Sequence, residues 1–109
     1  MTTATMDLDR VFHALADGGR RQILEQLTRR PSTVSELAAP LPMSLSAVLQ
    51  HVKVLESAGL VATQRQGKAR VCRMTPSALA AANRWISARE QDWQQALDRL
   101  ETLLAEDDD

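Results

Sequence analysis

The spacing of apolar residues predicts two helices at the start of the chain. Over residues 7–16 apolar side chains recur every three or four positions, which places them on one face of a helix. Asp7 precedes this pattern and is a suitable N-cap, because its carboxylate can accept a hydrogen bond from a free backbone N–H. The Gly18-Gly19 pair disfavours a helix interior and is expected to separate this helix from a second one over residues 20–29.

A short third helix and a longer fourth helix are predicted next. Ser32 or Thr33 can cap the short helix, which is expected to end near Pro40. The fourth helix is expected over residues 44–59, because Ser44 is a favourable N-cap and Gly59 is a favourable residue just beyond a helix end. Two helices with a tight connection between them are typical of a helix-turn-helix.

The fourth helix has an apolar face and a polar face. Four of its residues fall within about a third of the helix circumference and are expected to be buried: Leu45, Val48, Val52 and Leu55. The opposite side carries Ser46, Gln50, Lys53 and Ser57. Leu49 lies near the border between the two faces, so periodicity leaves its orientation open.

After Leu60 the pattern changes to a period of two, which is typical of strands. Residues 60–66 and 69–75 are rich in Val and Thr and flank Gly67-Lys68, so a two-stranded hairpin is predicted over residues 60–75. Its tip is basic and has Arg65, Lys68, Arg70 and Arg73 on or beside it.

A long final helix is predicted over residues 76–105. Its apolar residues recur at near-heptad spacing, namely Leu79, Ala82, Ile86, Trp93, Leu97, Leu100 and Leu104. A helix of this length has more apolar surface than one small domain can cover, so we expect it to pack against a partner.

Together these elements predict a mainly helical fold with a small β-hairpin, in the order α-α-α-α-β-β-α. This order corresponds to one winged helix-turn-helix domain over residues 1–109, in which residues 44–59 are the recognition helix, 60–75 the wing and 76–105 the dimerisation helix.

The charge distribution is compatible with binding of double-stranded DNA, although the formal net charge is −1. Residues 1–75 carry ten basic and six acidic side chains, whereas residues 76–109 carry three basic and eight acidic ones. A basic face can attract phosphates while an acidic segment points elsewhere, because the local field matters more than the total charge.

Candidate DNA contacts follow from side-chain chemistry. Gln50 can pair with an adenine edge, Ser46 can bond to a base or a phosphate, and Leu49 could touch a thymine methyl group if it faces outward. The basic residues of the hairpin suit phosphate or minor-groove contacts. The full candidate set is Ser44, Ser46, Ala47, Leu49, Gln50, Lys53, Arg65, Lys68 and Arg70.

The chain resembles the ArsR/SmtB family of winged-helix repressors over nearly its whole length. The stretches that carry the resemblance are VFHALAD from Val11 with RRQIL from Arg20, SAVLQHVKVL from Ser46 followed by GLV from Gly59, and RQGK from Arg65. One departure is Leu49, where the family often has a small polar residue facing DNA.

The resemblance implies a homodimer built from the first and last helices, with paired recognition helices on a palindromic operator and repression of the regulator's own operon. The expected dimer-interface residues are Leu8, Val11, Phe12, Leu15, Ile86, Trp93, Leu97 and Leu100.

The family's usual metal sites are not expected here. The stretch Glu36–Pro40 lacks the cysteine pair that family metal sensors often carry, and the last helix has no histidine. We therefore expect no metal, no cofactor and an inducer other than a metal ion, and a small-molecule effector stays open. Cys72 is the single cysteine and is expected to be a small buried residue, with a redox switch as the alternative.

Other function classes are less consistent with the sequence. An enzyme is not expected, because the two histidines lie far apart in sequence and no phosphate-binding glycine loop is present. His51 is expected to be a packed or hydrogen-bonded residue, with an approach to DNA as the alternative. The lack of a long apolar run and of a secretory signal predicts a cytoplasmic protein without membrane association. A winged helix that binds only protein is the remaining alternative.

Overall fold

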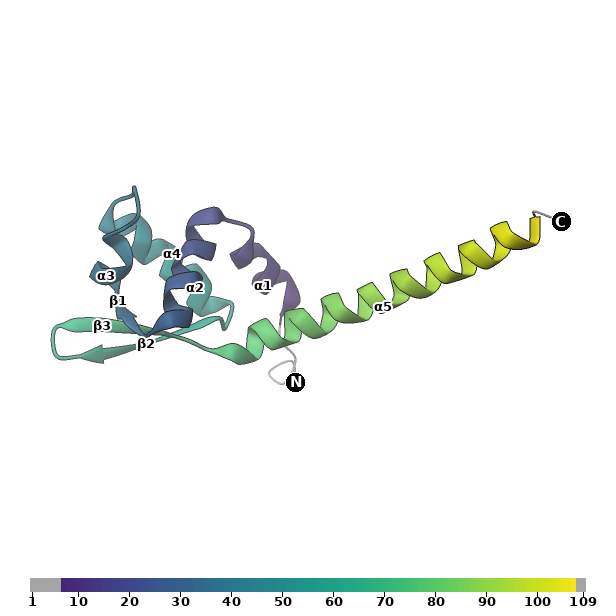
Figure 1. Ribbon diagram of the computed structural model, residues 1–109. Coiled ribbons are helices and arrows are strands. Elements are labelled where there is room, and N and C mark those ends of the chain that lie inside the picture. The colour runs from purple at the N-terminus through teal and green to yellow at the C-terminus, as the bar shows by residue number, and fades with distance from the viewer. Residues whose placement is uncertain (1–6, 108–109) are drawn as a thin grey trace.

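The computed structural model describes residues 7–107 and contains five helices and three strands in that part of the chain (Figure 1). Helices α1–α4 and the sheet pack together, and α5 runs from the end of the sheet past α1 and then away from the other elements. The element bounds are α1 (Leu8–Leu15), α2 (Gly18–Arg29), β1 (Ser32–Thr33), α3 (Val34–Ala38), α4 (Leu45–Ser57), β2 (Val61–Gln66), β3 (Ala69–Met74) and α5 (Pro76–Asp107).

Side-chain caps fix where the first three helices begin. Asp7 caps α1 by accepting a hydrogen bond from the backbone N–H of Arg10 at 3.3 Å. Asp17 does the same for α2, so α2 starts at Gly18 and the expected start at residue 20 is wrong. Thr33 and Glu36 form a reciprocal capping box at α3.

The sheet has three strands, which corrects the prediction of a hairpin alone. The hairpin of β2 and β3 forms as expected, and β1 adds to the free edge of β3 in the order β1-β3-β2. Ser32 pairs with Cys72 and Thr33 pairs with Val71. This short edge strand ties the segment before α3 to the base of the wing.

The hydrophobic core lies between the helices and the inner face of the sheet. The largest fully buried side chains are Val11, Ile23, Leu37, Val48, Val52, Leu55, Leu60 and Cys72. Val48, Val52 and Leu55 confirm three of the four residues expected on the buried face of α4. Leu45 does not, because 54% of its surface is exposed at the first turn of the helix.

Helix α5 extends far beyond the packed part of the molecule. It has 32 residues, against the range 76–105 expected from the sequence, and is therefore about 48 Å long. The radius of gyration is 19.5 Å, whereas a compact chain of this length would have about 13 Å. Among the described residues of α5, only Ala78 and Ala82 are buried. Most of this helix therefore gains no cover from its own protomer.

Candidate nucleic-acid interface

Helix α4 presents a polar face because both of its ends and its buried side are fixed. The Ser44 hydroxyl accepts a hydrogen bond from the backbone N–H of Ala47 at 3.1 Å, which caps the helix. Beyond its other end Gly59 has φ +78°, a left-handed conformation that glycine adopts without strain. With the apolar side buried, Ser46, Gln50 and Lys53 are left exposed to solvent.

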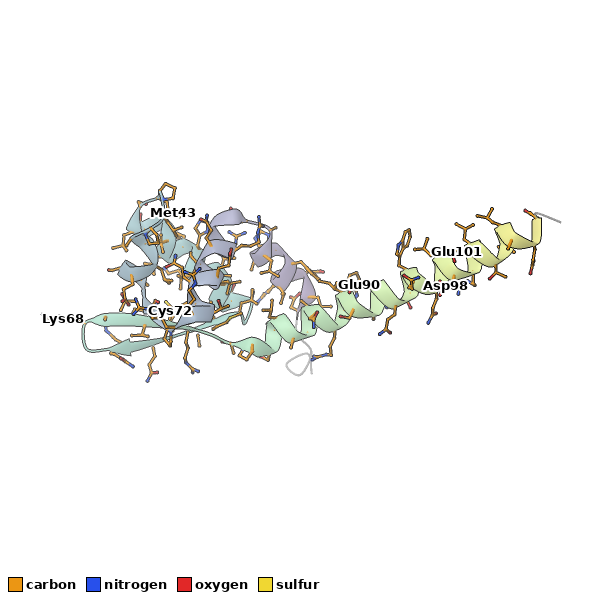
Figure 2. All side chains as sticks on the ribbon, in the orientation of Figure 1. Met43, Lys68, Cys72, Glu90, Asp98 and Glu101 are labelled. Carbon is orange, nitrogen blue, oxygen red and sulfur yellow. The ribbon has the colours of Figure 1, made fainter. Side chains whose placement is uncertain are left out.

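The wing has a tight two-residue tip. Gln66 pairs with Ala69 across the hairpin, so only Gly67 and Lys68 lie in the turn. Gly67 has φ +61°, which explains the need for glycine there. Lys68 lies at the outer end of the wing, while Cys72 lies farther back on β3, beneath the helices (Figure 2).

Two arginines face each other across the hairpin near its tip. Arg65 lies directly opposite Arg70, and directly opposite residues of a pair share one face of the sheet. This face also carries Cys72, so it is the face toward the helices. Within residues 7–107, neither arginine, nor Lys53 or Lys68, has a carboxylate within 4.0 Å. Like charges on directly opposite residues of a hairpin repel each other, and an anion bound between the two arginines would relieve this repulsion.

An open groove of about 700 Å³ joins the recognition helix to the wing. Five of the predicted DNA contacts line it together: Ser46, Leu49, Lys53, Lys68 and Arg70. Ser44, Gln50 and Arg65 are exposed but lie outside its lining, and Ala47 and Leu49 are half-buried. The lining also includes Thr33, Val34, Ser35 and Leu45, which sequence reasoning did not assign to this surface. The edge strand β1 and the start of α3 place the first three of them there.

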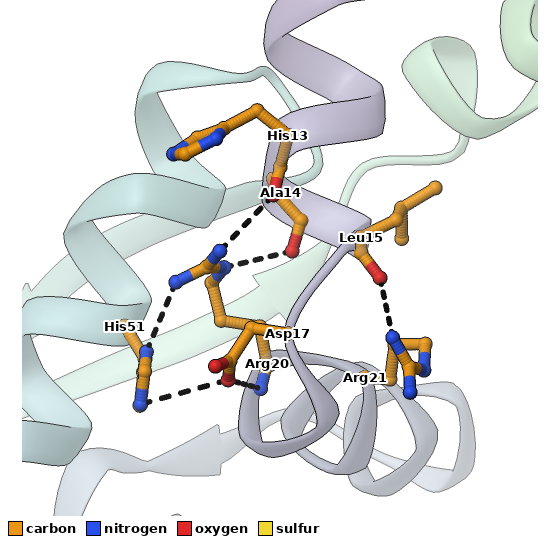
Figure 3. A network of polar contacts seen from close by, with 7 residues as sticks. All are labelled: His13, Ala14, Leu15, Asp17, Arg20, Arg21 and His51. Atoms are coloured by element: carbon orange, nitrogen blue, oxygen red, sulfur yellow. Dashed lines mark hydrogen bonds and ion pairs between the residues drawn. The ribbon is translucent and has the colours of Figure 1, made fainter.

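Three polar residues connect α4 to the turn between α1 and α2 (Figure 3). The Arg20 guanidinium donates to the carbonyl oxygens of Ala14 at 2.8 Å and His13 at 3.0 Å, at the end of α1. Its Nη1 lies 3.4 Å from His51 Nδ1. Because a guanidinium only donates, Nδ1 is the acceptor, and the neutral ring carries its proton on Nε2.

The carboxylate of Asp17 completes this polar cluster, which we call the Asp17–Arg20–His51 clamp. Asp17 Oδ2 lies 3.8 Å from His51 Nε2 and accepts the α2 capping hydrogen bond at 3.1 Å. The pKa of Asp17 lies below its usual value, mainly through the hydrogen bond from the Arg20 backbone N–H, with nearby positive charge, including that of the Arg20 guanidinium, adding to the effect. A Cβ at Gly19 would meet Met43 Cε at 3.0 Å and Asp17 Oδ2 at 3.1 Å, so a larger residue there would displace these atoms by a few tenths of an ångström.

Helices α1 and α5 carry the residues expected to contact a second protomer. Phe12 and Trp85 pack edge to face with ring centroids 5.9 Å apart, and the Arg89 guanidinium lies 5.1 Å from the Trp85 ring. Leu8, Phe12 and Leu15 are half-buried. Val11 is fully buried in the core of its own protomer, so its side chain cannot face a partner and it drops out of the expected interface.

The distal part of α5 carries an uncovered apolar stripe. Its members recur at spacings of seven, four, three and four residues and thus share one side of the helix. Four of them are exposed and Leu97 is half-buried; the stripe consists of Ile86, Trp93, Leu97, Leu100 and Leu104. Glu90, Asp98 and Glu101 lie along the same projecting part of the helix (Figure 2).

Cys72 is placed where a thiol is least reactive. Its side chain is fully buried, and burial raises the pKa of the thiol above its usual value, with the nearby charge of Glu56 adding to the effect. The thiolate is the reactive form, so this environment argues against the redox alternative.

Two further properties concern the part of the chain that the structure describes. Over residues 7–107 no three side chains of His, Cys, Asp or Glu lie close enough together to hold a metal ion. None of the helices there is both long and apolar enough to cross a membrane.

Comparisons with known proteins agree with this geometry. Residues 17–63 match the family described as "Bacterial regulatory protein, arsR family". The HTH-type transcriptional regulator Rv2034 of Mycobacterium tuberculosis is 42% identical over 101 residues, which are 93% of this chain and 92% of the relative.

Solved structures of similar proteins have the same fold. An ArsR-like transcriptional regulator from Rhodococcus sp. RHA1 matches with a TM-score of 0.77 at 29% identity, over 94% of this chain and 96% of that one. The homodimeric winged helix-turn-helix DNA-binding domain of Mb0332 from Mycobacterium bovis matches with a TM-score of 0.64 at 31% identity, over 83% of this chain and 86% of that one.

The comparisons confirm the predicted fold class and the resemblance. These relatives are named as transcriptional regulators, a non-enzymatic class, which agrees with the prediction that the chain is not an enzyme. The chain belongs to the arsR family of bacterial regulatory proteins and is a transcriptional regulator with a winged helix-turn-helix DNA-binding domain.

Proposed function

We propose that the protein is a homodimeric repressor of its own operon, that it binds a palindromic operator through α4 and the wing, and that its inducer is not a metal ion. Residues 1–109 act as one domain in this proposal, and the protein works in the cytoplasm. The observation that carries the proposal is the groove between α4 and the wing, where Lys53, Lys68 and Arg70 meet Ser46.

The division of labour between helix and wing follows from side-chain chemistry. Gln50 and Ser46 project from the exposed face of α4, whose width suits a major groove, and their hydrogen-bonding groups can read base edges. Arg65, Lys68 and Arg70 lie on the wing, where flexible cations suit the phosphate backbone and the minor groove.

The dimer is supported by the uncovered stripe on α5. Apolar side chains on a helix that projects into solvent are stabilised when a second copy covers them. The Mycobacterium bovis neighbour is described as homodimeric, and the same assembly would place one α4 helix on each half of a two-fold symmetric site. Sedimentation should therefore report about 24 kDa, twice the chain mass of 12.0 kDa.

Selection of bound duplexes from a random pool tests the proposal. The purified full chain should enrich a site with two-fold symmetry, and its affinity should fall steeply with salt concentration because phosphate contacts release counterions. Enrichment of no sequence, with weak binding that ignores salt, would instead favour a winged helix that binds only protein. Enrichment of a single half-site would contradict the dimer.

A further inference from the structure

The exposed side chain of Leu45 is an unexpected feature of the recognition surface. Leu45 is the first residue of α4 after the N-cap, and 54% of its surface is exposed. Neither Leu45 nor Leu49 is among the apolar side chains that form the core or pack against it. The two residues lie one helical turn apart, so they are neighbours on one side of α4.

The position of these leucines points to DNA rather than to protein as the group that covers them. Both line the groove that also contains Lys53, Lys68 and Arg70, so the surrounding surface carries positive charge. A polyanion is attracted to such a surface, whereas an apolar protein segment would leave these cations uncompensated. The projecting part of α5 runs away from α4 and the other elements (Figure 1).

The major groove offers one apolar group on its base edges, the C5-methyl of thymine. We propose that Leu45, supported by Leu49 one turn later, contacts a thymine C5-methyl group in each half of the operator and so selects thymine at that position. This inference rests on the proposed function and specifies what part of the DNA the start of α4 reads. It differs from the hydrogen-bonding readout by Gln50, since it needs no polar contact.

The test combines a change in the protein with a change of one methyl group in the DNA. Each thymine of a selected duplex is replaced in turn by deoxyuridine, which lacks only the C5-methyl, and affinities are measured for the wild type and for Leu45→Ala. Burial of one methyl group is worth about fourfold in affinity. At one symmetric pair of thymines, we expect replacement by deoxyuridine to lower the affinity of the wild type about fourfold per methyl group. The same replacement should not lower the affinity of Leu45→Ala any further.

Two controls separate this contact from a general loss of binding or folding. Leu103 is exposed to a similar degree, 59%, but lies on α5, so Leu103→Ala should keep the full response to deoxyuridine. Lys68→Ala should weaken thymine and deoxyuridine duplexes by the same factor. Alanine favours helix, and the Leu45 side chain lies outside the core, so the thermal midpoint of Leu45→Ala should match the wild type.

The outcomes distinguish the inference from the function on which it rests. If the wild type binds its selected site with the expected salt dependence but no thymine methyl couples to Leu45, the inference is wrong and the proposed function stands. The inference would also be wrong if the affinity losses caused by Leu45→Ala and by removal of the methyl group simply added in the combined experiment. If the wild type selects no DNA sequence at all, both fail.

Discussion

Truncation of the α5 stripe should dissociate the dimer without unfolding the protomer. Leu100 and Leu104 are 50% and 57% exposed, so a partner can cover about half of each side chain. Full burial of a leucine contributes about 2 kcal/mol, and covering half of it about 1 kcal/mol. The double variant Leu100→Ala/Leu104→Ala removes two leucines from each protomer and so four such contributions from a symmetric dimer. The total loss is about 4 kcal/mol at most, because alanine keeps the Cβ.

This loss corresponds to a weakening of the dimer by between about a hundredfold and a thousandfold. Alanine has the highest helix propensity and neither leucine belongs to the core, so the protomer should stay folded. Sedimentation equilibrium over a concentration series measures the change directly: the wild type should be dimeric at micromolar concentration, and the variant should approach 12.0 kDa.

Leu103 provides a matched control on the same helix. It is 59% exposed and lies about 100° around the helix from Leu104 and about 60° from Leu100, at the margin of the stripe, so Leu103→Ala should weaken the dimer much less than the double variant. If the double variant remained as dimeric as the wild type, or if Leu103→Ala dissociated the dimer equally, the assignment of the stripe to the interface would be refuted.

Four further predictions concern the clamp, the thiol and metals. His51→Leu should lower the free energy of unfolding in urea by about 1 kcal/mol through loss of the hydrogen bond from Arg20, whereas His51→Gln, which can still accept it, should lose less; equal stability of the two variants would contradict the clamp. The free energy of unfolding, measured in urea, should fall as the pH drops through the folded-state pKa of Asp17, which lies below the usual value of 3.8, because a lowered pKa stabilises the fold only while the carboxylate is charged. The variant Asp17→Asn should therefore show a shallower dependence of stability on acid pH. An unchanged dependence would exclude this contribution of Asp17. Native Cys72 should react with a maleimide about a hundredfold more slowly than in urea, and fast native labelling would reopen the redox alternative. Zinc, cadmium and arsenite should leave operator affinity unchanged, since a tenfold shift, or about 1.4 kcal/mol of coupling, would indicate a metal site.

Local chemistry made several elements predictable from the sequence. Asp7 and Ser44 cap α1 and α4 as expected, because a cap needs only the residues of one helical turn. The two-residue turn at Gly67-Lys68 is equally local, since the glycine supplies the required positive φ.

Features that depend on distant residues were not predictable in the same way. Strand β1 has two residues and no periodicity of its own, and it exists because Ser32 and Thr33 pair with β3. The two glycines at the start of α2 lower helix propensity, yet the Asp17 cap and the packing of the following turns outweigh this cost.

The candidate site also combines locally predictable features with features that depend on distant residues. Periodicity indicates the side of α4 on which Leu45 lies but not whether another element covers it, so its exposure became visible only in the structure. The clamp joins Asp17 and Arg20 to His51, which lies more than thirty positions away. The polar face of α4 and the basic wing tip were identified from sequence, and their shared groove was not.

The affinity ratio between a selected operator and a random duplex tests the central claim most directly. Fluorescence anisotropy over a range of salt concentrations should show that Gln50→Ala costs about 1 to 3 kcal/mol on the operator and much less on random DNA. Lys68→Ala should weaken both duplexes alike and lower the salt slope by about one unit. If Gln50→Ala preserved the ratio while Lys68→Ala abolished it, the claim that α4 reads the sequence and the wing holds the backbone would be contradicted.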